Sequence, residues 1–221
     1  MPAMTIDKAE SDQKTDSEVG LNHNKLNKRK FGYFVIKRVF DVVVSCVGVV
    51  VLFLPMLLVA CCIKLESPGP AIFTQKRMGK DGNEFTIYKF RTMHQSAPSD
   101  SATKDIVGVE QYITRIGSFL RRTSIDELPQ LYNIIRGDMS IVGYRPVCLT
   151  EERLNMLRQE HGVFAIRPGL TGLAQVSGRD NVSLEEKVQL DARYTCECSI
   201  KMDIFCLAKT VGIVFTGEGV I

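Results

Sequence analysis

Two adjacent carboxylates, Asp126 and Glu127, have the residue types and spacing best suited to chemistry on a phosphate. They lie within residues 121–138, RRTSIDELPQLYNIIRGD, directly after a pair of arginines. Adjacent carboxylates repel each other unless a cation or a positive dipole stabilises their charge. Such a pair is suited to holding Mg²⁺, and an ionised aspartate beside it can serve as a nucleophile.

The same stretch also fits an ordinary helix start. Ser124 and Glu127 have the spacing of a capping box, and Asp126 could itself be the N-cap, with Pro129 in the first turn. The two interpretations are compatible, because a helix N-terminus favours negative charge by about 0.3–1 kcal/mol per group. It also offers free N–H groups to a phosphate.

Basic residues form a second candidate group, since a diphosphate needs several donors and the arginine fork matches phosphate geometry. The candidates are Lys89, Arg91, Arg121, Arg145 and Arg167. Taken singly, each could be a solvated surface residue. Their frequent position beside Pro or Gly in predicted loops favours a binding site instead.

A glycine-rich stretch, residues 167–179 (RPGLTGLAQVSGR), is predicted to be irregular. Its three glycines allow a backbone to approach a ligand closely. Thr171 and Gln175 offer neutral hydrogen bonds to such a ligand. The three histidines have no nucleophile nearby in the sequence, and we assign them no role.

An uncharged apolar segment, residues 42–63, precedes all of these motifs. As a helix it would be roughly 33 Å long, enough to cross a hydrocarbon core of about 30 Å. Pro55 lies inside it and should bend it. Basic residues flank both ends, and such flanks prefer the cytoplasm. We therefore expect a re-entrant helix, with a spanning helix and a buried core helix as the alternatives.

The remaining chain divides into a tail and a catalytic domain. Residues 1–30 are polar and are predicted to be disordered, residues 31–64 carry the membrane helix, and residues 65–221 form a small cytosolic domain. A β-hairpin is expected at residues 71–75 and 85–90, around a turn at 79–82, and residues 94–105 are predicted to be a flexible loop. Helices are predicted at residues 111–122, 128–136, 151–159, 184–194 and 202–215, the last lying at the bilayer interface. The fold class is α+β and mostly helical.

The net charge and the cysteines bear on nucleic-acid binding and on the cellular compartment. The net charge of +3 over 221 residues is too small to indicate nucleic-acid binding. The seven cysteines are odd in number and lack the spacing of a disulfide framework. They are typical of reduced thiols that face the cytosol.

Taken together, these motifs resemble the bacterial sugar transferases, the monotopic polyprenol-phosphate sugar-1-phosphate transferases. The resemblance covers residues 34–210, nearly everything except the tail. It rests on several motifs that occur in the same order, at residues 37–41 (KRVFD), 69–79, 88–93 (YKFRTM), 124–131 (SIDELPQL), 137–143, 145–146 and 167–179.

The resemblance implies an enzyme of the cytoplasmic (inner) membrane, with its catalytic domain on the cytoplasmic face and a helix broken at Pro55. An aspartate matching Asp126 attacks the sugar-bearing phosphorus of a UDP-sugar and releases UMP. The phosphosugar then passes to polyprenol phosphate, an initiating step of surface polysaccharide or glycoconjugate synthesis. Glu127 matches a Mg²⁺-associated glutamate. The basic positions that match those around the nucleotide and phosphates are Lys89, Arg91, Arg121 and Arg145.

Two positions depart from the family pattern. The family usually has proline where Tyr144 precedes Arg145, and serine where Leu54 precedes Pro55. Two other functions therefore stay open: a glycosyltransferase that releases UDP, and an inactive or regulatory membrane-bound homologue. The candidate segment lacks the Asp-x-Asp metal motif expected of a glycosyltransferase that releases UDP. The intact Asp126–Glu127 pair counts against an inactive homologue. The sugar, the pathway and the oligomeric state, a homo-oligomer included, are not determined by the sequence.

Overall fold

The structure, a computed structural model, describes residues 30–98, 106–178 and 182–216. The predicted disordered tail lies outside the described residues except for Lys30, as does the 99–105 part of the predicted flexible loop. The described chain is mostly helical and contains two separate two-stranded sheets. The predicted α+β class, dominated by helices, is confirmed.

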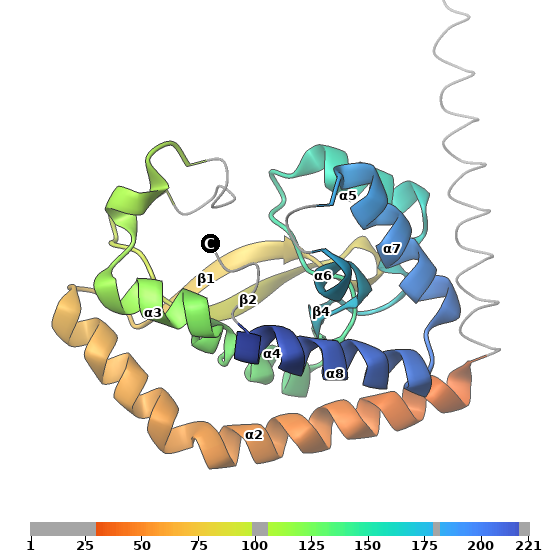
Figure 1. Cartoon of the computed structure of the whole chain (residues 1–221), viewed down its shortest axis with the longest axis horizontal. Helices are drawn as coiled ribbons and strands as arrows, with labels where there is room; N and C mark the ends of the chain where they lie inside the picture. Colours follow the sequence, from red (N-terminus) through yellow and green to blue (C-terminus); the bar gives the residue numbers. More distant parts are fainter. Residues whose placement is uncertain (1–29, 99–105, 179–181, 217–221) are drawn as a thin grey trace, which may run out of the picture.

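One long helix, α2 (Phe31–Glu66), contains the whole apolar segment, and Pro55 lies inside it without ending it. Only Asp41, Ser45 and Ile63 are buried within it, so the buried-core alternative is wrong. Among the described residues, α2 is the one helix long and apolar enough to cross a membrane. Figure 1 shows α2 bent into two limbs along the lower side of the protein.

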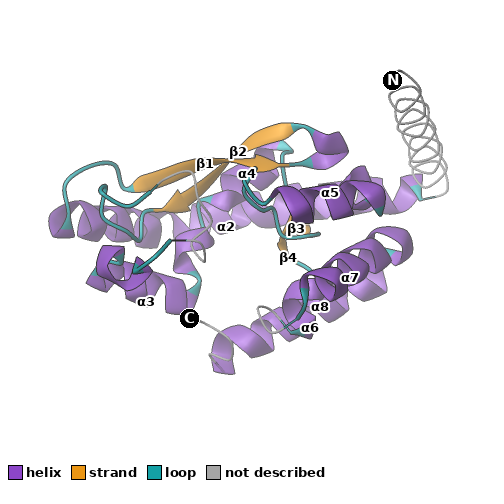
Figure 2. Ribbon diagram, turned by 90° about the horizontal axis from the view of Figure 1, so that it is seen from above, coloured by secondary structure: helices purple, strands orange, loops and turns teal. Residues whose placement is uncertain are grey.

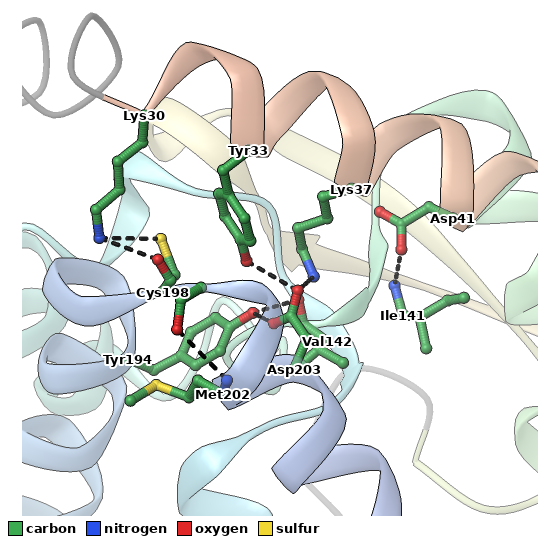
Figure 3. Close-up of polar contacts among 11 residues, drawn as sticks. Lys30, Tyr33, Lys37, Asp41, Ile141, Val142, Tyr194, Cys198, Met202 and Asp203 are labelled. Carbon is green, nitrogen blue, oxygen red and sulfur yellow. Dashed lines mark hydrogen bonds and ion pairs between the residues drawn. The ribbon is translucent and has the colours of Figure 1, made fainter.

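The first limb of α2 is attached to the last two helices, α7 (Leu184–Glu197) and α8 (Ile200–Thr216), through one carboxylate. Asp203 accepts hydrogen bonds from Tyr33 Oη at 2.9 Å and from Lys37 Nζ at 3.0 Å. Tyr194 Oη donates to the other oxygen of the same carboxylate (Figure 3). The start of α2 is therefore fixed to the globular part of the protein.

The second limb returns to the same globular part. The Glu66 carboxylate accepts the backbone N–H groups of Arg115 and Ile116 at 2.8 and 3.1 Å, in the first turn of α3 (Arg115–Thr123). These N–H groups have no partner within their own helix, and a carboxylate at a helix N-terminus is favourable. Ile63 joins a small apolar cluster with Ala71, Phe90 and Leu120.

The hairpin is confirmed, with longer strands than predicted. β1 (Ile72–Met78) pairs antiparallel with β2 (Glu84–Phe90) around the 3₁₀ turn η1 (Lys80–Gly82). Because side chains alternate along a strand, Lys89 lies on the same face of β2 as the buried Ile87. The strand thus carries a cation at the end of an otherwise apolar face.

The helix after the acidic pair, α4 (Gln130–Arg136), ends at Gly137, as predicted. Gly137 has a φ of 101°, a conformation that glycine adopts without a steric penalty. Arg38, from the first limb of α2, donates to two carbonyl oxygens in the last turn of α4, at 2.6 and 2.9 Å. Arg167 donates to the Gly137 carbonyl at 2.8 Å. Both arginines thus oppose the negative end of the helix dipole.

The glycine-rich stretch differs from the prediction. It contains β4 (Gly169–Thr171), which pairs parallel with β3 (Ser140–Val142). A Cβ atom at Gly172 would lie 1.8 Å from the Gly143 carbonyl oxygen, and one at Gly169 would lie 2.1 Å from the Gly143 nitrogen. These glycines therefore allow close approach to the backbone that follows β3.

Most of the predicted helices are present: α4, α5 (Glu152–Glu160), α7 and α8 match the predictions for residues 128–136, 151–159, 184–194 and 202–215. The prediction for residues 111–122 is wrong in its first part, because the 3₁₀ turn η3 (Val109–Tyr112) and a short linker precede α3. The 3₁₀ turns η4 (Ile125–Glu127) and η5 (Val163–Ala165) were not predicted, and α6 (Leu173–Ser177) lies in the stretch that was predicted to be irregular. In Figure 2, β3 and β4 lie between the hairpin on one side and α6, α7 and α8 on the other. The main core forms there and includes Ile87, Ile134, Met139, Val142, Tyr144, Val163, Phe164 and Tyr194.

We predict that Gly172→Ala destabilises the fold by about 1–3 kcal/mol, the usual effect of forcing extra atoms into a packed interior. The added methyl would overlap backbone that cannot rotate away. The matched control is Gly212→Ala on α8, where an added Cβ meets no atom within 4 Å. That variant should be stabilised by about 0.5–1 kcal/mol, because alanine favours a helix. Unfolding midpoints in detergent would measure both, and an unchanged Gly172→Ala midpoint would contradict the packing described above.

Candidate active site

The acidic pair lies in a tight turn between two helices. Helix α3 ends at Ser124, which has a φ of 56° in the left-handed region, and its N–H bonds back to the Arg121 carbonyl at 3.1 Å. The 3₁₀ turn η4 follows and carries both carboxylates. The Ser124 side chain makes no capping hydrogen bond, and α4 begins only after Pro129. The predicted capping box is therefore wrong.

Glu127 is bound by two cations from distant segments. Lys89 Nζ on β2 donates to Oε1 at 2.9 Å, and Arg145 Nη2, after β3, donates to the same oxygen at 2.7 Å. Arg145 Nη1 lies 3.5 Å from the other oxygen, Oε2. The Glu127 side chain is only 15% exposed. Burial alone would raise the pKa of Glu127, but the charges of Arg145 and Lys89 outweigh burial and hold it below its usual range.

Asp126 has a different environment. It is partly buried, and none of the described residues donates a hydrogen bond to its carboxylate. Burial raises its pKa, Lys89 lowers it, and the neighbouring charge of Glu127 raises it again. Arg145 and Arg121 also lower it, more weakly. The result is a carboxylate near several cations that none of them holds in a fixed hydrogen bond.

Arg121 completes the group that the structure brings together. Its Nε donates to the buried Thr92 hydroxyl at 2.9 Å, which fixes the guanidinium on the side of Asp126. Thr92 follows Arg91 in a motif that the sequence analysis recognised, yet no role was predicted for it. Hydroxyls that position an arginine carry no local sequence signal, so only the fold reveals this contact.

Three predicted binding residues, Arg91, Gln175 and Arg167, make hydrogen bonds with groups other than the acidic pair. Arg91 is buried and donates to Pro68 O and to Ser67 O and Oγ at 2.7–2.8 Å, so it fastens the chain after α2. Gln175 donates to the Leu170 carbonyl at 3.1 Å. These contacts leave Arg91 Nε and Gln175 Oε1 buried without a hydrogen-bond partner among the described residues. The roles of both side chains in substrate binding stay predictions.

Arg167 also lies elsewhere, beside the end of α4. With Lys37 and Arg38 it lines a cavity of about 160 Å³ between the first limb of α2 and the start of β3. The acidic pair, in contrast, is on the side of Arg145, beyond the other end of β3. The position of Arg167 does not support a direct contact with a substrate held at Asp126. That contact stays a prediction.

Arg77 on β1 is a further cation that was recognised only as part of a motif. Burial lowers its pKa, and the charge of Arg145 lowers it too, whereas the charges of Cys148, Glu151 and Glu127 raise it. Its Nη2 donates to Gln75 Oε1 at 2.6 Å. The edge of the site next to Arg145 is therefore more strongly positive than the predicted residues alone would make it.

Comparison with known protein families matches residues 32–217 to the bacterial sugar transferases. The chain belongs to the bacterial sugar transferase family. Among its relatives, a UDP-glucose:undecaprenyl-phosphate glucose-1-phosphate transferase of Caulobacter vibrioides is 42% identical over 190 residues, covering 82% of this chain and 70% of that protein. The galactosyl transferase CpsE of Streptococcus agalactiae is 37% identical over 204 residues.

The CpsE protein of Streptococcus agalactiae is much longer than this chain. The match with it covers 86% of this chain but only 44% of that protein. A UDP-galactose-lipid carrier transferase of Erwinia amylovora, 37% identical over 207 residues, is covered to 43% while 87% of this chain is matched. The chain thus spans less than half the length of these two curated relatives.

The donor set of this sugar transferase fits a Mg²⁺ ion that is shared with a substrate. Within the described ranges, no group of three or more His, Cys, Asp or Glu side chains is placed to enclose a metal. Mg²⁺ is usually bound through one or two carboxylates together with substrate phosphates and water. Asp126 and Glu127 supply that number of carboxylates.

We predict that neutralising the two neighbouring carboxylates changes stability in opposite directions at pH 7. The raised pKa of Asp126 means that the folded state binds its proton more tightly than the unfolded state, so stability is lost as pH rises through this window. Asp126→Asn removes that loss and should raise the unfolding midpoint. The gain should vanish below about pH 4, where the carboxyl is protonated in the unfolded chain as well.

For Glu127 the sign is reversed. Its lowered pKa contributes stability that is present above the unfolded value of about 4.3 and is lost as pH falls toward the folded value. Glu127→Gln should therefore lower the free energy of unfolding at pH 7 by about 1–3 kcal/mol, as for a buried hydrogen-bonding group that loses its partner. Midpoints of both variants between pH 4 and pH 8 provide the test, and shifts of the same sign would contradict these electrostatics.

Proposed function

We propose that the chain transfers a sugar 1-phosphate from a UDP-sugar to a polyprenol phosphate and releases UMP. The observation that carries the proposal is the asymmetry of the acidic pair. Glu127 is bound by Lys89 and Arg145, whereas Asp126 beside it is partly exposed and has no hydrogen-bond donor among the described residues. One carboxylate is therefore fixed in place and the other is available to react.

In the proposed reaction, an oxygen of Asp126 attacks the phosphorus that bears the sugar. A bond forms between this oxygen and phosphorus, and the bond from phosphorus to the bridging oxygen breaks, so that UMP leaves with the electron pair. An oxygen of polyprenol phosphate then attacks the same phosphorus and displaces Asp126. The product is a polyprenyl diphosphate sugar, and the enzyme is restored. Splitting the transfer into two steps lets a soluble donor and a lipid acceptor react at different times.

The cations around the pair support such a reaction. Phosphoryl transfer depends mainly on positioning and on neutralising the charge of the phosphate oxygens. Arg145 and Lys89 form ion pairs with Glu127, and Arg121 lies near enough to Asp126 for its charge to lower the pKa of that carboxyl. Mg²⁺, if held by Glu127, would supply further charge neutralisation for the diphosphate.

The acceptor and the polyprenyl diphosphate sugar product are lipids, and the geometry of α2 supports a re-entrant arrangement on the cytoplasmic side of the inner membrane. Both limbs contact the same globular part, through Tyr33 and Lys37 near one end and Glu66 at the other. A straight helix of this length would measure roughly 54 Å and separate its ends widely. Large apolar side chains between these anchors are exposed, among them Val50, Val51, Phe53, Leu54, Leu57 and Leu58.

The names of the relatives support the substrate classes. The Caulobacter protein is named for UDP-glucose and undecaprenyl phosphate, and an exopolysaccharide production protein of Rhizobium leguminosarum is 40% identical over 187 residues, or 80% of this chain and 94% of that protein. We infer that this chain acts at the start of a surface polysaccharide pathway. Experiment is needed to identify the sugar that it transfers.

Turnover tests the proposal directly. Detergent-solubilised protein is incubated with Mg²⁺, polyprenol phosphate and a panel of UDP-sugars, and UMP and UDP are resolved. We predict lipid-dependent UMP from at least one donor. Asp126→Asn should lower its rate by about 10³-fold or more, as for other essential nucleophiles. The control is Asp81→Asn in the exposed hairpin turn. Release of UDP would point to a glycosyltransferase, and near-normal UMP release by Asp126→Asn would exclude it as the nucleophile.

The topology of α2 can be tested separately. Phe31→Cys and Leu65→Cys, both at exposed positions near the two ends, are each placed in a chain whose other exposed cysteines are serine. A membrane-impermeant maleimide is applied to spheroplasts before and after lysis. We expect neither position to react until lysis, because both ends face the cytoplasm. Reaction of one position in intact spheroplasts would show a spanning helix.

A further inference from the structure

The segment after β3 places two neighbouring residues in opposite environments. The Arg145 side chain is 47% exposed and extends to Glu127, whereas Tyr144 directly before it is only 1% exposed. An exposed arginine has considerable rotamer freedom. The position of its guanidinium therefore depends on how firmly its own backbone is fixed. The contacts that fix this backbone come from the interior of the protein.

The Gly169 N–H donates to the Tyr144 carbonyl at 2.8 Å, and Arg158 on α5 holds the next carbonyl, that of Arg145. Arg158 is a fully buried arginine, 1% exposed, and three of its nitrogen atoms donate hydrogen bonds to two acceptors. Nε and Nη2 both donate to Asp191 Oδ2 on α7, at 3.1 and 2.5 Å. Nη1 donates to the Arg145 carbonyl oxygen at 2.8 Å. The guanidinium thus connects two helices to the backbone of a residue that contacts the acidic pair.

Tyr144 holds the same guanidinium from another side. The Arg158 Cζ atom lies 5.2 Å from the centroid of the Tyr144 ring, within the range of a cation–π contact. The Tyr144 ring also meets Phe164 edge to face at 5.5 Å. The orientation of Arg158 is therefore determined by an aromatic ring and a carboxylate together.

A buried ion pair is not by itself a device for stability, since apolar residues of similar volume often replace one without loss. Such a pair needs another reason to be present. Here Nη1 of Arg158 donates to the Arg145 carbonyl, and the Arg145 side chain in turn binds Glu127, next to Asp126. The arrangement forms a continuous chain of contacts from α7 to the acidic pair.

We propose that Arg158 is a positioning residue for the proposed phosphosugar transfer, acting through the Arg145 carbonyl, with Asp191 and Tyr144 holding its guanidinium in place. The inference rests on the proposed function of the acidic pair. Arg158 itself does not touch the substrate. Its contribution is to keep the Arg145 guanidinium where it meets Glu127 and the phosphates.

The test replaces the whole ion pair, Arg158→Met together with Asp191→Leu, so that no buried charge is left alone. We expect the unfolding midpoint to stay near that of the wild type, whereas kcat/KM for UMP release falls about 10- to 100-fold, the scale of a small misplacement of a catalytic group. The matched control is Arg153→Gln with Glu185→Gln. This exposed pair, at 2.7 Å, also joins α5 to α7 but does not contact Arg145, and its loss should leave kcat/KM unchanged.

A double-mutant cycle separates positioning from general structural damage. If Arg158 acts through Arg145, replacing the buried pair in an Arg145→Ala background should change kcat/KM by less than about twofold. The same large loss in both backgrounds would overturn the proposal. So would an unchanged kcat/KM after replacement of the pair in the wild-type background.

A measurement that needs no turnover keeps this inference distinct from the proposed function. The backbone amides of Tyr144, Arg145 and residues 147–149 should exchange hydrogen faster after the buried pair is replaced, and at the wild-type rate in the Arg153–Glu185 control. Absence of UMP from the wild-type protein with every donor would defeat the proposed function alone. Unchanged exchange of these amides would defeat the positioning role, whatever the turnover.

Discussion

The Glu127 carboxylate accepts hydrogen bonds from Lys89 on β2 and from Arg145 after β3, and it lies in the turn between α3 and α4. Three segments that are far apart in the sequence therefore meet at one buried group. A buried carboxylate is tolerated only when its charge is compensated, and here the compensation comes from two cations. Because this requirement fixes the turn, it also fixes Asp126, the neighbour that is left free of hydrogen bonds from the described residues.

The sequence allowed the local elements and the acidic pair to be predicted, because both depend on short patterns. The hairpin follows from alternating residues around 79–82, and the end of α4 follows from Gly137. The partners of Glu127 could not be predicted in the same way, since Lys89 is 38 positions away and Arg145 is 18. Such pairings are decided by how the strands and helices pack.

Some residue types that the sequence analysis assigned to substrate binding also hydrogen-bond to the protein backbone in this structure. Arg91 satisfies carbonyl oxygens after α2, and Arg167 satisfies one after α4. The glycines at 169 and 172 admit a neighbouring strand. A backbone carbonyl and a phosphate both accept hydrogen bonds, so an arginine pattern alone does not distinguish them. Tyr144 is a related case, because the residue that departs from the family pattern is buried against Arg158.

The contact between Arg38 and the last turn of α4 has a practical consequence for the predicted boundary between the membrane helix and the catalytic domain. The two are separate in sequence but share hydrogen bonds, and Asp41 likewise accepts the N–H of Ile141 on β3 (Figure 3). Cutting the chain after α2 to obtain a soluble fragment would remove the donors for α4 and the acceptor for β3, and would strip the apolar cover from Leu131 beside Gly48. Helix α2 therefore also stabilises the globular part of the protein. Lipid or detergent that stabilises α2 indirectly stabilises the turn that carries Asp126 and Glu127.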